Sequence, residues 1–328
     1  MKRTILPIIG LFAAVCCSRT SDDPTSTAQT ELSTPVISVV DTSPKNVDVP
    51  AKISASAPLF EKFDCLREFG ALPAAHRGGP RRGYPENAIE TMQKSFENGA
   101  RIFEVDVAES KDGVLFLLHD DDLDRTTART GPADQVRWNE LDTIFLTSFD
   151  TPTEFTIPSL IEALEWAKSN NAVLELDKKR STQFASIIAD VRKANAENNV
   201  ILITYSYAQA EEVAQLAPDL MLTASVDEPS DIDELLARGV KRENLIAWTG
   251  TETINPELWQ AINARGVEVA FGTLGRRGER LDDVFNQDRD VSEYADLANS
   301  GVQLIATDFS DRVSRVLDDE NAIAVCGF

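Results

Sequence analysis

The chain contains two histidines in 328 residues, and both lie in a stretch rich in carboxylates and arginine. His76 opens a His-Arg-Gly-Gly segment, His119 follows an apolar run, and Glu104 and Asp106 stand between them. A single histidine is more often a packed or surface residue than a catalyst, but the spaced Glu-x-Asp pair and the arginine favour chemistry here. Histidine exchanges protons near neutral pH without a large pKa shift, and carboxylates bind hard divalent cations. We therefore expect acid–base chemistry next to a metal ion.

A β-hairpin is expected to bring one histidine to the carboxylates. Two short apolar strands, at 101–107 and 113–119, flank an Asp-Gly pair, which is a strong hairpin signal. A hairpin centred on that pair would put Asp106 roughly opposite His119. The sequence therefore predicts a carboxylate pair and a histidine that face one another on neighbouring strands.

Beyond the hairpin, strand and helix signals alternate along the chain. Apolar runs occur at 172–176, 200–204, 220–224, 244–248, 267–271 and 302–306. Between most of them lie helix-like segments: Ser159 and Glu162 have the spacing of a capping box, and Pro256 stands early in another helix, where proline is tolerated. Such alternation indicates a parallel α/β sheet. With a further strand at 73–76, the pattern predicts a (β/α)₈ TIM barrel with a hairpin irregularity near its second and third strands.

The barrel hypothesis explains why the polar residues should meet. The alternative, a doubly wound sheet, lacks support because the glycines after His76 do not have the spacing of a dinucleotide fingerprint. In a barrel the active site lies at the carboxyl ends of the strands, and His76, Glu104, Asp106 and Asp177 all fall late in predicted strands. Their hard oxygen ligands suit one divalent ion, Mg²⁺ or Ca²⁺.

Several short motifs follow one another in a fixed order. They are His-Arg-Gly at 76–78, Pro-Glu-Asn at 85–87, Glu-x-Asp at 104–106, His-Asp at 119–120, Leu-Asp-Arg-Thr-Thr at 123–127, Ile-Pro-Ser-Leu at 157–160, an acidic-x-Lys signature at 177–179 and Thr-Asp at 307–308. This order resembles the glycerophosphodiester phosphodiesterase family over roughly residues 70–318. The resemblance implies a TIM barrel and metal-dependent hydrolysis of a small-molecule glycerophosphodiester to glycerol 3-phosphate and an alcohol.

The resemblance also implies a role for each motif. Glu104, Asp106 and Asp177 would bind the divalent ion, which neutralises the phosphodiester charge. Arg77 and Lys179 would contact the phosphate oxygens. The two histidines would exchange protons as general base and acid; they are His76 and His119. The sequence does not decide which histidine plays which part, and we assign the acid to His119. A hydroxyl of the glycerol is a candidate for the first nucleophile.

The third metal ligand depends on how the later signature is aligned. Many family members have glutamate in this signature, whereas the chain reads Glu-Leu-Asp-Lys-Lys from Glu175 to Lys179. Aligning Lys179 with the family lysine makes Asp177 the ligand. Aligning Glu175 instead would leave the phosphate short of a cation, so we choose Asp177. We expect Glu86 to position Arg77 rather than to bind metal.

Three further features have competing interpretations. We interpret the aspartates between 120 and 124 as a solvated loop, because they lack the ligand pattern of a calcium hand. Arg276 and Arg277 follow a late strand, where barrels often bind phosphate, and they either contact substrate or are exposed. Trp248 lies near a strand end and is a candidate wall for the headgroup.

Two other functions stay open at this point. The same site could act as a lysophospholipase D or phospholipase on lipids, which would need an apolar rim at the barrel mouth. Alternatively, the chain is an inactive binding lipoprotein, although the presence of both histidines and Glu104 argues against that class. The headgroup and the oligomeric state cannot be inferred from the sequence.

The first 17 residues predict a signal peptide of lipoprotein type. Two basic residues precede an apolar run from Ile5 to Val15 that is too short to span a bilayer. Cys16 and Cys17 follow in a sequence that resembles a lipoprotein cleavage box, and which of them is lipidated stays open. Residues 18–56, rich in Ser, Thr and Pro, predict a disordered tether, which leaves 57–328 as the barrel. We expect a bacterial envelope protein held to the membrane by its lipid anchor only, or else a secreted one.

Composition narrows the possible partners. The net charge of −22 argues against nucleic acid, whose binding depends on Lys and Arg. A hydrophobic content of 42% is enough for a sizeable core. Cys65 and Cys326 lie near the two ends of the predicted barrel, where first and last elements meet. In an exported protein this placement favours a Cys65–Cys326 disulfide over two free thiols.

Overall fold

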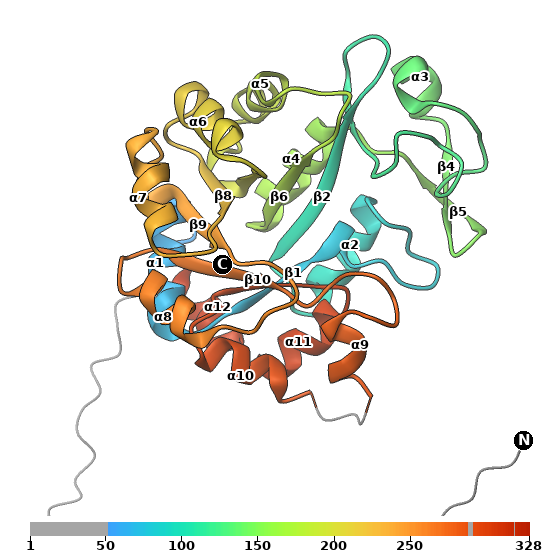
Figure 1. The fold of residues 1–328 in the computed structure, drawn as a ribbon. Helices are drawn as coiled ribbons and strands as arrows, with labels where there is room; N and C mark the ends of the chain where they lie inside the picture. The colour runs from blue at the N-terminus through green and yellow to red at the C-terminus, as the bar shows by residue number, and fades with distance from the viewer. Residues whose placement is uncertain (1–51, 288–290, 318) are drawn as a thin grey trace, which may run out of the picture. The chain divides into compact units, whose positions relative to one another are not determined.

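The computed structural model describes residues 52–287, 291–317 and 319–328 (Figure 1). The predicted signal peptide at 1–17 and most of the predicted tether at 18–56 lie outside the described residues. The backbone N–H of Ile53 donates to the carbonyl of Val325 at 2.8 Å. Contacts with the barrel therefore begin a few residues before the predicted boundary at residue 57.

Eight parallel strands form a closed barrel, as predicted. Strand β1 pairs with both β2 and β11, and this double pairing closes the sheet. The strands are buried on both faces because one face lines the barrel and helices cover the other. The barrel strands are β1 (Leu72–Ala75), β2 (Ile102–Glu109), β6 (Val173–Lys178), β7 (Val200–Ile203), β8 (Met221–Ser225), β9 (Leu245–Trp248), β10 (Glu268–Gly272) and β11 (Leu304–Thr307).

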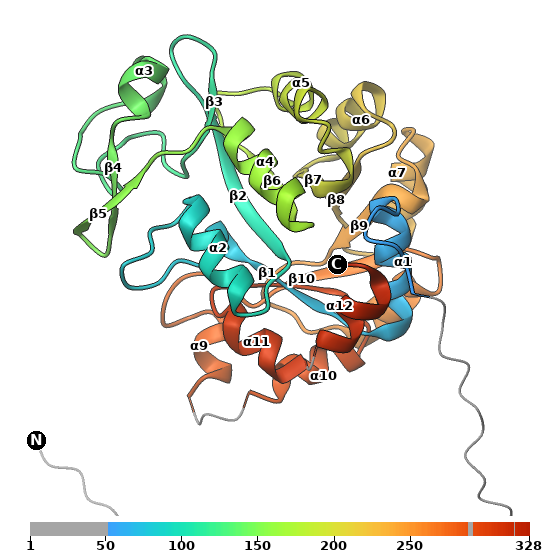
Figure 2. The same ribbon diagram turned by 180° about the vertical axis from the view of Figure 1, so that it is seen from behind.

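Helices surround the barrel in the order of the strands (Figures 1 and 2). They are α2 (Ile89–Glu97), α4 (Leu160–Asn170), α5 (Phe184–Ala194), α6 (Tyr207–Leu216), α7 (Ser230–Ala237), α8 (Pro256–Asn263), α9 (Leu281–Phe285), α10 (Glu293–Asn299) and α11 (Ser310–Leu317). The capping box at Ser159 and Glu162 is present at the start of α4, and α8 begins at Pro256 behind the Asn255 cap. Both local signals in the sequence are thus confirmed.

The predicted hairpin joins β2 to the short strand β3 (Leu115–Leu117). Its register differs from the prediction by one residue: Val107 pairs with Leu117, so Asp106 stands opposite Leu118 rather than His119. The reason is the connection, in which Gly113 adopts a left-handed φ of 84° and donates its N–H to the Ser110 carbonyl. A glycine in this conformation is typical of a three-residue hairpin loop, which moves the pairing by one position.

A small lobe follows the hairpin. It contains α3 (Trp138–Leu141) and the two-stranded sheet of β4 (Phe145–Ser148) and β5 (Thr151–Thr156). Its apolar side chains form a hydrophobic cluster of their own. Figures 1 and 2 show this lobe, in green, to one side of the barrel.

Helices α1 (Leu59–Phe69) and α12 (Glu320–Cys326) close the amino end of the barrel. Phe63 and Leu66 of α1 pack in one cluster with the first inward-facing residues of the strands. The predicted disulfide between Cys65 and Cys326 is present, with a Cα–Cα distance of 5.5 Å. In the part of the chain that the structure describes, no helix combines the length and apolarity that a bilayer span requires.

Candidate active site

Neighbouring strands deliver the acidic residues to the barrel mouth in register. Glu104 pairs with Glu175, and Asp106 pairs with Asp177, across β2 and β6. Residues two apart on a strand face the same side, so all four carboxylates face the barrel interior. Asp106 and Asp177 occupy the upper level, nearer the carboxyl ends, where barrel enzymes carry their catalytic groups.

Glu104, Asp106 and Asp177 form a carboxylate triad, in which one oxygen from each residue lies within 4.8 Å of the others. All three are buried. Glu104 Oε2 accepts from the backbone N–H of Arg77 at 2.8 Å, and Asp106 Oδ2 accepts from Asn87 Nδ2 at 2.7 Å. Asp177 Oδ1 is buried and has no hydrogen-bond partner among the described residues. A hard divalent cation fits this donor set, because it supplies the partner that the unpaired oxygen lacks.

The ammonium of Lys179 compensates part of the triad's charge. Its Nζ lies 2.5 Å from Asp106 Oδ1 and donates to Asp177 Oδ2 at 2.7 Å. Burial opposes the ionisation of Asp106, but the charges of Lys179 and His119 outweigh it and lower the pKa of Asp106. Burial and the charge of Asp106 raise the pKa of Glu104 to about 8. Full ionisation of the triad would set three carboxylate charges against the one lysine, so a bound cation would favour the ionised form of Glu104.

His76 is held by the carboxylate of Asp308, which directly follows the last barrel strand. Its Nδ1 lies 2.8 Å from Asp308 Oδ1, and its Nε2 lies 4.0 Å from Glu104 Oε2. Asp308 is itself fixed by an ion pair with Arg280 and by its backbone N–H, which donates to Asp282 at 2.8 Å. Burial lowers the pKa of His76, but the hydrogen bond with Asp308 and the two carboxylate charges outweigh it and raise that pKa.

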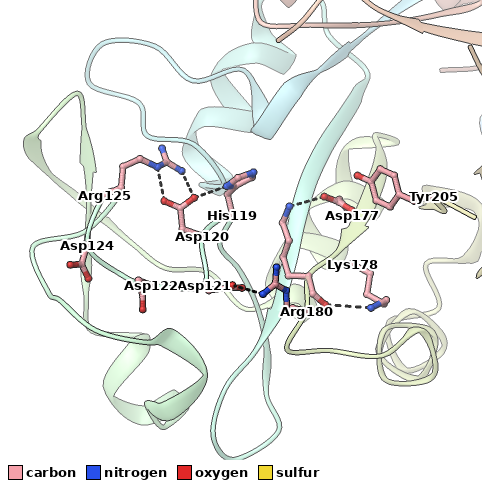
Figure 3. Close-up of a pocket in the computed structure, with 11 residues that line it drawn as sticks. His119, Asp120, Asp121, Asp122, Asp124, Arg125, Asp177, Lys178, Arg180 and Tyr205 are labelled. Atoms are coloured by element: carbon pink, nitrogen blue, oxygen red, sulfur yellow. Dashed lines mark hydrogen bonds and ion pairs between the residues drawn. The ribbon is translucent and has the colours of Figure 1, made fainter. Parts of the chain in front are cut away.

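His119 is held in the same way by its neighbour. Its Nδ1 lies 2.6 Å from Asp120 Oδ1, and Arg125 donates to both oxygens of Asp120 at 2.6 and 3.0 Å (Figure 3). Arg125 also donates twice to Glu86 at 2.7 Å. The hydrogen bonds from Arg125 to Asp120 are the largest cause that lowers the pKa of Asp120, to about 2. Both histidines thus engage Nδ1 with a carboxylate, so Nε2 is the nitrogen left for a substrate.

Two adjoining cavities meet at the triad. The outer basin has a volume of about 940 Å³ and is bounded by His119, Asp120, Asp121, Asp122, Asp124, Arg125, Asp177, Lys178, Lys179, Arg180 and Tyr205 (Figure 3). The inner cavity has a volume of about 210 Å³ and reaches down between the strands. Both histidines and the triad line it, together with Glu175, Ile203, Thr204, Tyr205, Thr223, Trp248, Leu274 and Ala306. Trp248 lines the inner cavity and does not bound the outer basin, so its predicted contact with the headgroup stays a prediction.

The structure brings the predicted site residues together. Arg77 Nη1 donates to Glu86 Oε1 at 3.0 Å, and its Nε lies 3.9 Å from Asp106 Oδ2. Glu86 therefore positions Arg77, as expected, and its carboxylate lies outside the triad. The residue at 77 has a left-handed φ of 52°, an uncommon conformation for a non-glycine residue that is typical of functional sites.

Two interpretations of the sequence were wrong or incomplete. Asp120 is not a solvated loop residue, because its carboxylate holds both His119 and Arg125. Asp121 and Asp122 are exposed, as expected. Arg276 and Arg277 are exposed, whereas Arg280, a few residues on, is the arginine of that loop that reaches the site.

Sequence reasoning missed the residues that hold the histidines and the triad: Asp308, Arg280, Arg125 and Asn87. Asp308, Arg125 and Asn87 stand in motifs that the sequence shows, but their partners lie between 5 and 232 positions away. The His-Asp and Thr-Asp motifs were the signal that could have identified Asp120 and Asp308.

A TIM barrel with two carboxylate-held histidines at its mouth, beside a carboxylate triad that could hold a metal ion, has the arrangement of a hydrolase. A family model described as "Glycerophosphoryl diester phosphodiesterase family" matches residues 76–312. The chain belongs to this family, as its motifs indicated.

Individual relatives agree with this assignment. The chain is similar to the crystal structure of a glycerophosphoryl diester phosphodiesterase from Parabacteroides distasonis, with 26% identity, a TM-score of 0.69, and coverage of 82% of this chain and 93% of that one. It is 27% identical to a glycerophosphodiester phosphodiesterase of Caldanaerobacter subterraneus, over 46% of this chain and 65% of that protein. It is 29% identical to an uncharacterized protein of Bacillus subtilis, over 46% of this chain and 66% of that protein. The matched segments thus span less than two thirds of either curated relative.

Proposed function

We propose that the protein hydrolyses glycerophosphodiesters to glycerol 3-phosphate and an alcohol. The observation that carries the proposal is the carboxylate triad with two histidines beside it, each held through Nδ1 by an aspartate. This constellation lies at the carboxyl ends of the strands in a barrel that belongs to the glycerophosphoryl diester phosphodiesterase family. The family gives the reaction class, and the arrangement of these side chains supports it.

Glu104, Asp106 and Asp177 would hold one divalent ion, Mg²⁺ or Ca²⁺. When bound, such an ion supplies charge neutralisation at a nonbridging phosphate oxygen. Lys179, already between two of the carboxylates, and Arg77 would bind the other phosphate oxygens. A guanidinium fork suits two oxygens of one phosphate. These cations would stabilise the charge that builds up on the phosphoryl group.

The two histidines would exchange protons through Nε2. His76 would take the proton of the nucleophilic hydroxyl, from water or from the glycerol itself, as the new O–P bond forms. The old P–O bond then breaks, and His119 gives its proton to the departing alkoxide. When the nucleophile is water, this single step gives glycerol 3-phosphate. When it is the glycerol hydroxyl, the product is a cyclic phosphate; water then attacks that phosphorus, His119 takes the proton of the water, and His76 returns its proton to the glycerol oxygen that leaves. We assign the acid to His119 because it lines both cavities, whereas His76 lines only the inner one. An alcohol that leaves through the open basin would pass His119. Acid–base help of this kind contributes roughly 10²–10⁴-fold.

The outer basin favours a polar headgroup over an acyl chain. Among the described residues that bound it, every one carries a charged or polar side chain. An acyl chain in this basin would remove charged groups from water, which costs free energy. The exposed phenylalanines Phe145 and Phe149 belong to the β4–β5 hairpin and do not bound the basin. We therefore place water-soluble glycerophosphodiesters ahead of lysophospholipids and intact phospholipids.

Export to the cell envelope belongs to the same proposal. The Cys65–Cys326 disulfide is of a kind that persists in oxidising compartments. Together with the signal segment expected at residues 1–17, this supports an exported lipoprotein or a secreted protein.

The reaction and the substrate class can be tested by following each phosphodiester with phosphorus NMR after the full chain and Mg²⁺ or Ca²⁺ are added. Glycerophosphocholine and glycerophosphoethanolamine should give a glycerol 3-phosphate signal, and lysophosphatidylcholine at equal concentration should react at least about ten-fold more slowly. Faster turnover of the lysolipid would replace the proposed substrate class with the lysophospholipase D activity. No turnover of any diester, combined with measurable ligand binding, would favour an inactive binding protein.

A further inference from the structure

Glu175 is a buried carboxyl group that has no partner. Its exposed fraction is 5%, and across residues 52–287, 291–317 and 319–328 no side chain or backbone group forms a hydrogen bond or ion pair with it. Each member of the carboxylate triad, by contrast, has at least one donor. A buried polar group without a partner costs free energy, so its retention points to a ligand that pairs with it.

Glu175 lies deeper in the barrel than the triad's upper level. It is two residues before Asp177 on β6, which places it one inward-facing level lower, about 6–7 Å away along the strand. The neighbouring residue on β7 in that register is Ile201, and Met221 follows on β8. Both belong to the apolar cluster that fills the amino end of the barrel. Next to this apolar layer the carboxyl group forms no hydrogen bond or ion pair with the described residues that would stabilise the fold.

The inner cavity gives Glu175 access to a bound ligand. The volume of about 210 Å³ corresponds to about seven water molecules at about 30 Å³ each, which is enough space for a three-carbon polyol. Thr204 and Thr223 line the same space, and the hydroxyl of Thr204 already donates to the Thr223 carbonyl at 2.7 Å. The cavity thus has the size and the polar groups for a three-carbon alcohol with free hydroxyls.

A glycine fixes one apolar wall of this cavity. A Cβ atom on Gly272 would lie 2.7 Å from Cη2 of Trp248. The indole ring therefore occupies space that any other residue at 272 would fill. Trp248 and Leu274 line the same cavity as Glu175 and give it apolar surface, which suits the C–H face of a small polyol whose hydroxyls turn to the carboxyl group.

We propose that Glu175 accepts a hydrogen bond from a hydroxyl of the substrate's glycerol moiety and thereby selects glycerol esters over phosphate esters without hydroxyls. The inference rests on the proposed function, in which the phosphate binds at the triad. A three-carbon chain that extends downward from that phosphate reaches the level of Glu175. The outer basin then receives the leaving alcohol.

The test compares two ligands that differ only in hydroxyl groups. Affinities for glycerol 3-phosphate and for propyl phosphate are measured by calorimetry with the full chain in the presence of Mg²⁺. The wild-type protein should prefer glycerol 3-phosphate by roughly ten-fold to a hundred-fold, because propyl phosphate would leave a buried polar group without its hydrogen bond. Glu175→Leu should bring this ratio close to one by weakening glycerol 3-phosphate binding, and propyl phosphate should bind within about two-fold of wild type.

Two variants control the result. Glu165→Leu removes a carboxyl group from the exposed face of α4 and should keep the wild-type ratio. Glu175→Gln keeps an oxygen acceptor and should retain part of the preference. If Glu175→Leu fails to fold by circular dichroism, the Gln variant decides: a reduced ratio supports the proposal and an unchanged ratio overturns it.

A wild-type protein without preference, or an unchanged ratio in a folded Glu175→Leu, would also overturn the assignment of Glu175. Failure of the proposed function has a different signature. In that case glycerophosphocholine is not turned over, although the difference in binding between the two phosphate esters persists.

Discussion

Replacing Asp308 by asparagine should show how much the carboxylate of Asp308 contributes to kcat and to the pKa of His76. Asp308 Oδ1 lies 2.8 Å from His76 Nδ1, and the loss of such a charge-assisted hydrogen bond costs roughly 1.5–3 kcal/mol. If that energy is expressed in the transition state, kcat falls by roughly ten-fold to a hundred-fold. KM should change little, because Asp308 does not bound the outer basin or the inner cavity.

The same substitution should move the pH profile in a defined direction. As the proposed base, His76 must be unprotonated, so kcat/KM rises with pH along an acid limb set by the pKa of His76 in the free enzyme. Burial lowers that pKa, but Asp308 is the largest cause that raises it. Removing the carboxylate charge lowers the pKa of His76. The acid limb of Asp308→Asn should therefore move to lower pH.

A matched control is available on the same arginine. Asp283 lies 3.1 Å from Arg280 Nε and does not contact His76, so Asp283→Asn should keep the wild-type profile. Initial rates with glycerophosphocholine between pH 5 and 9 would be compared for the three proteins. An acid limb that stays in place or moves to higher pH in Asp308→Asn would refute the assignment of His76 as the base held by Asp308.

Two further predictions address the acid and the barrel's closed end. His119→Ala should reduce kcat by roughly 10²–10⁴-fold while the circular dichroism melt stays close to wild type, since the side chain of His119 is 35% exposed; near-normal turnover would remove His119 from the mechanism. The double variant Cys65→Ser/Cys326→Ser should lower the free energy of unfolding by about 2–4 kcal/mol in denaturant titration and leave kcat unchanged, because α1 and α12 close the end of the barrel opposite the triad. A loss of activity in the folded double variant would contradict that placement.

Local signals in the sequence were sufficient for much of the fold. The capping box at Ser159 involves residues three apart, and both of its hydrogen bonds form in α4. The apolar runs became barrel strands because both faces of each strand are buried. The hairpin was predicted correctly, but its register was not. A three-residue loop with a left-handed Gly113 differs from a two-residue loop by one position, and the Asp-Gly pair alone does not distinguish them.

The sequence was sufficient to predict the three carboxylates proposed to bind the metal ion. It was much less informative about the residues that hold the histidines in place. The carboxylate triad lies on adjacent strands in register, so the predicted barrel topology and the alternation along each strand bring it together. Asp308 contacts His76 although the two residues are 232 positions apart in the sequence. No local pattern predicts which aspartate forms this contact. From the sequence, Glu175 is only an alternative to Asp177 as metal ligand. Strand alternation places both on the same side of β6 but does not show how deep the cavity beside them is.

The most direct test of the account is the metal dependence of product release. The full chain, stripped of metal with a chelator, should release no glycerol 3-phosphate from glycerophosphocholine until Mg²⁺ or Ca²⁺ is restored. Asp177→Asn should need a higher metal concentration for half-maximal rate, since Asp177 Oδ1 is the triad oxygen left without a partner. Release of glycerol 3-phosphate at the full rate in chelator, or an unchanged metal requirement in Asp177→Asn, would contradict the assignment of Glu104, Asp106 and Asp177 as the metal site.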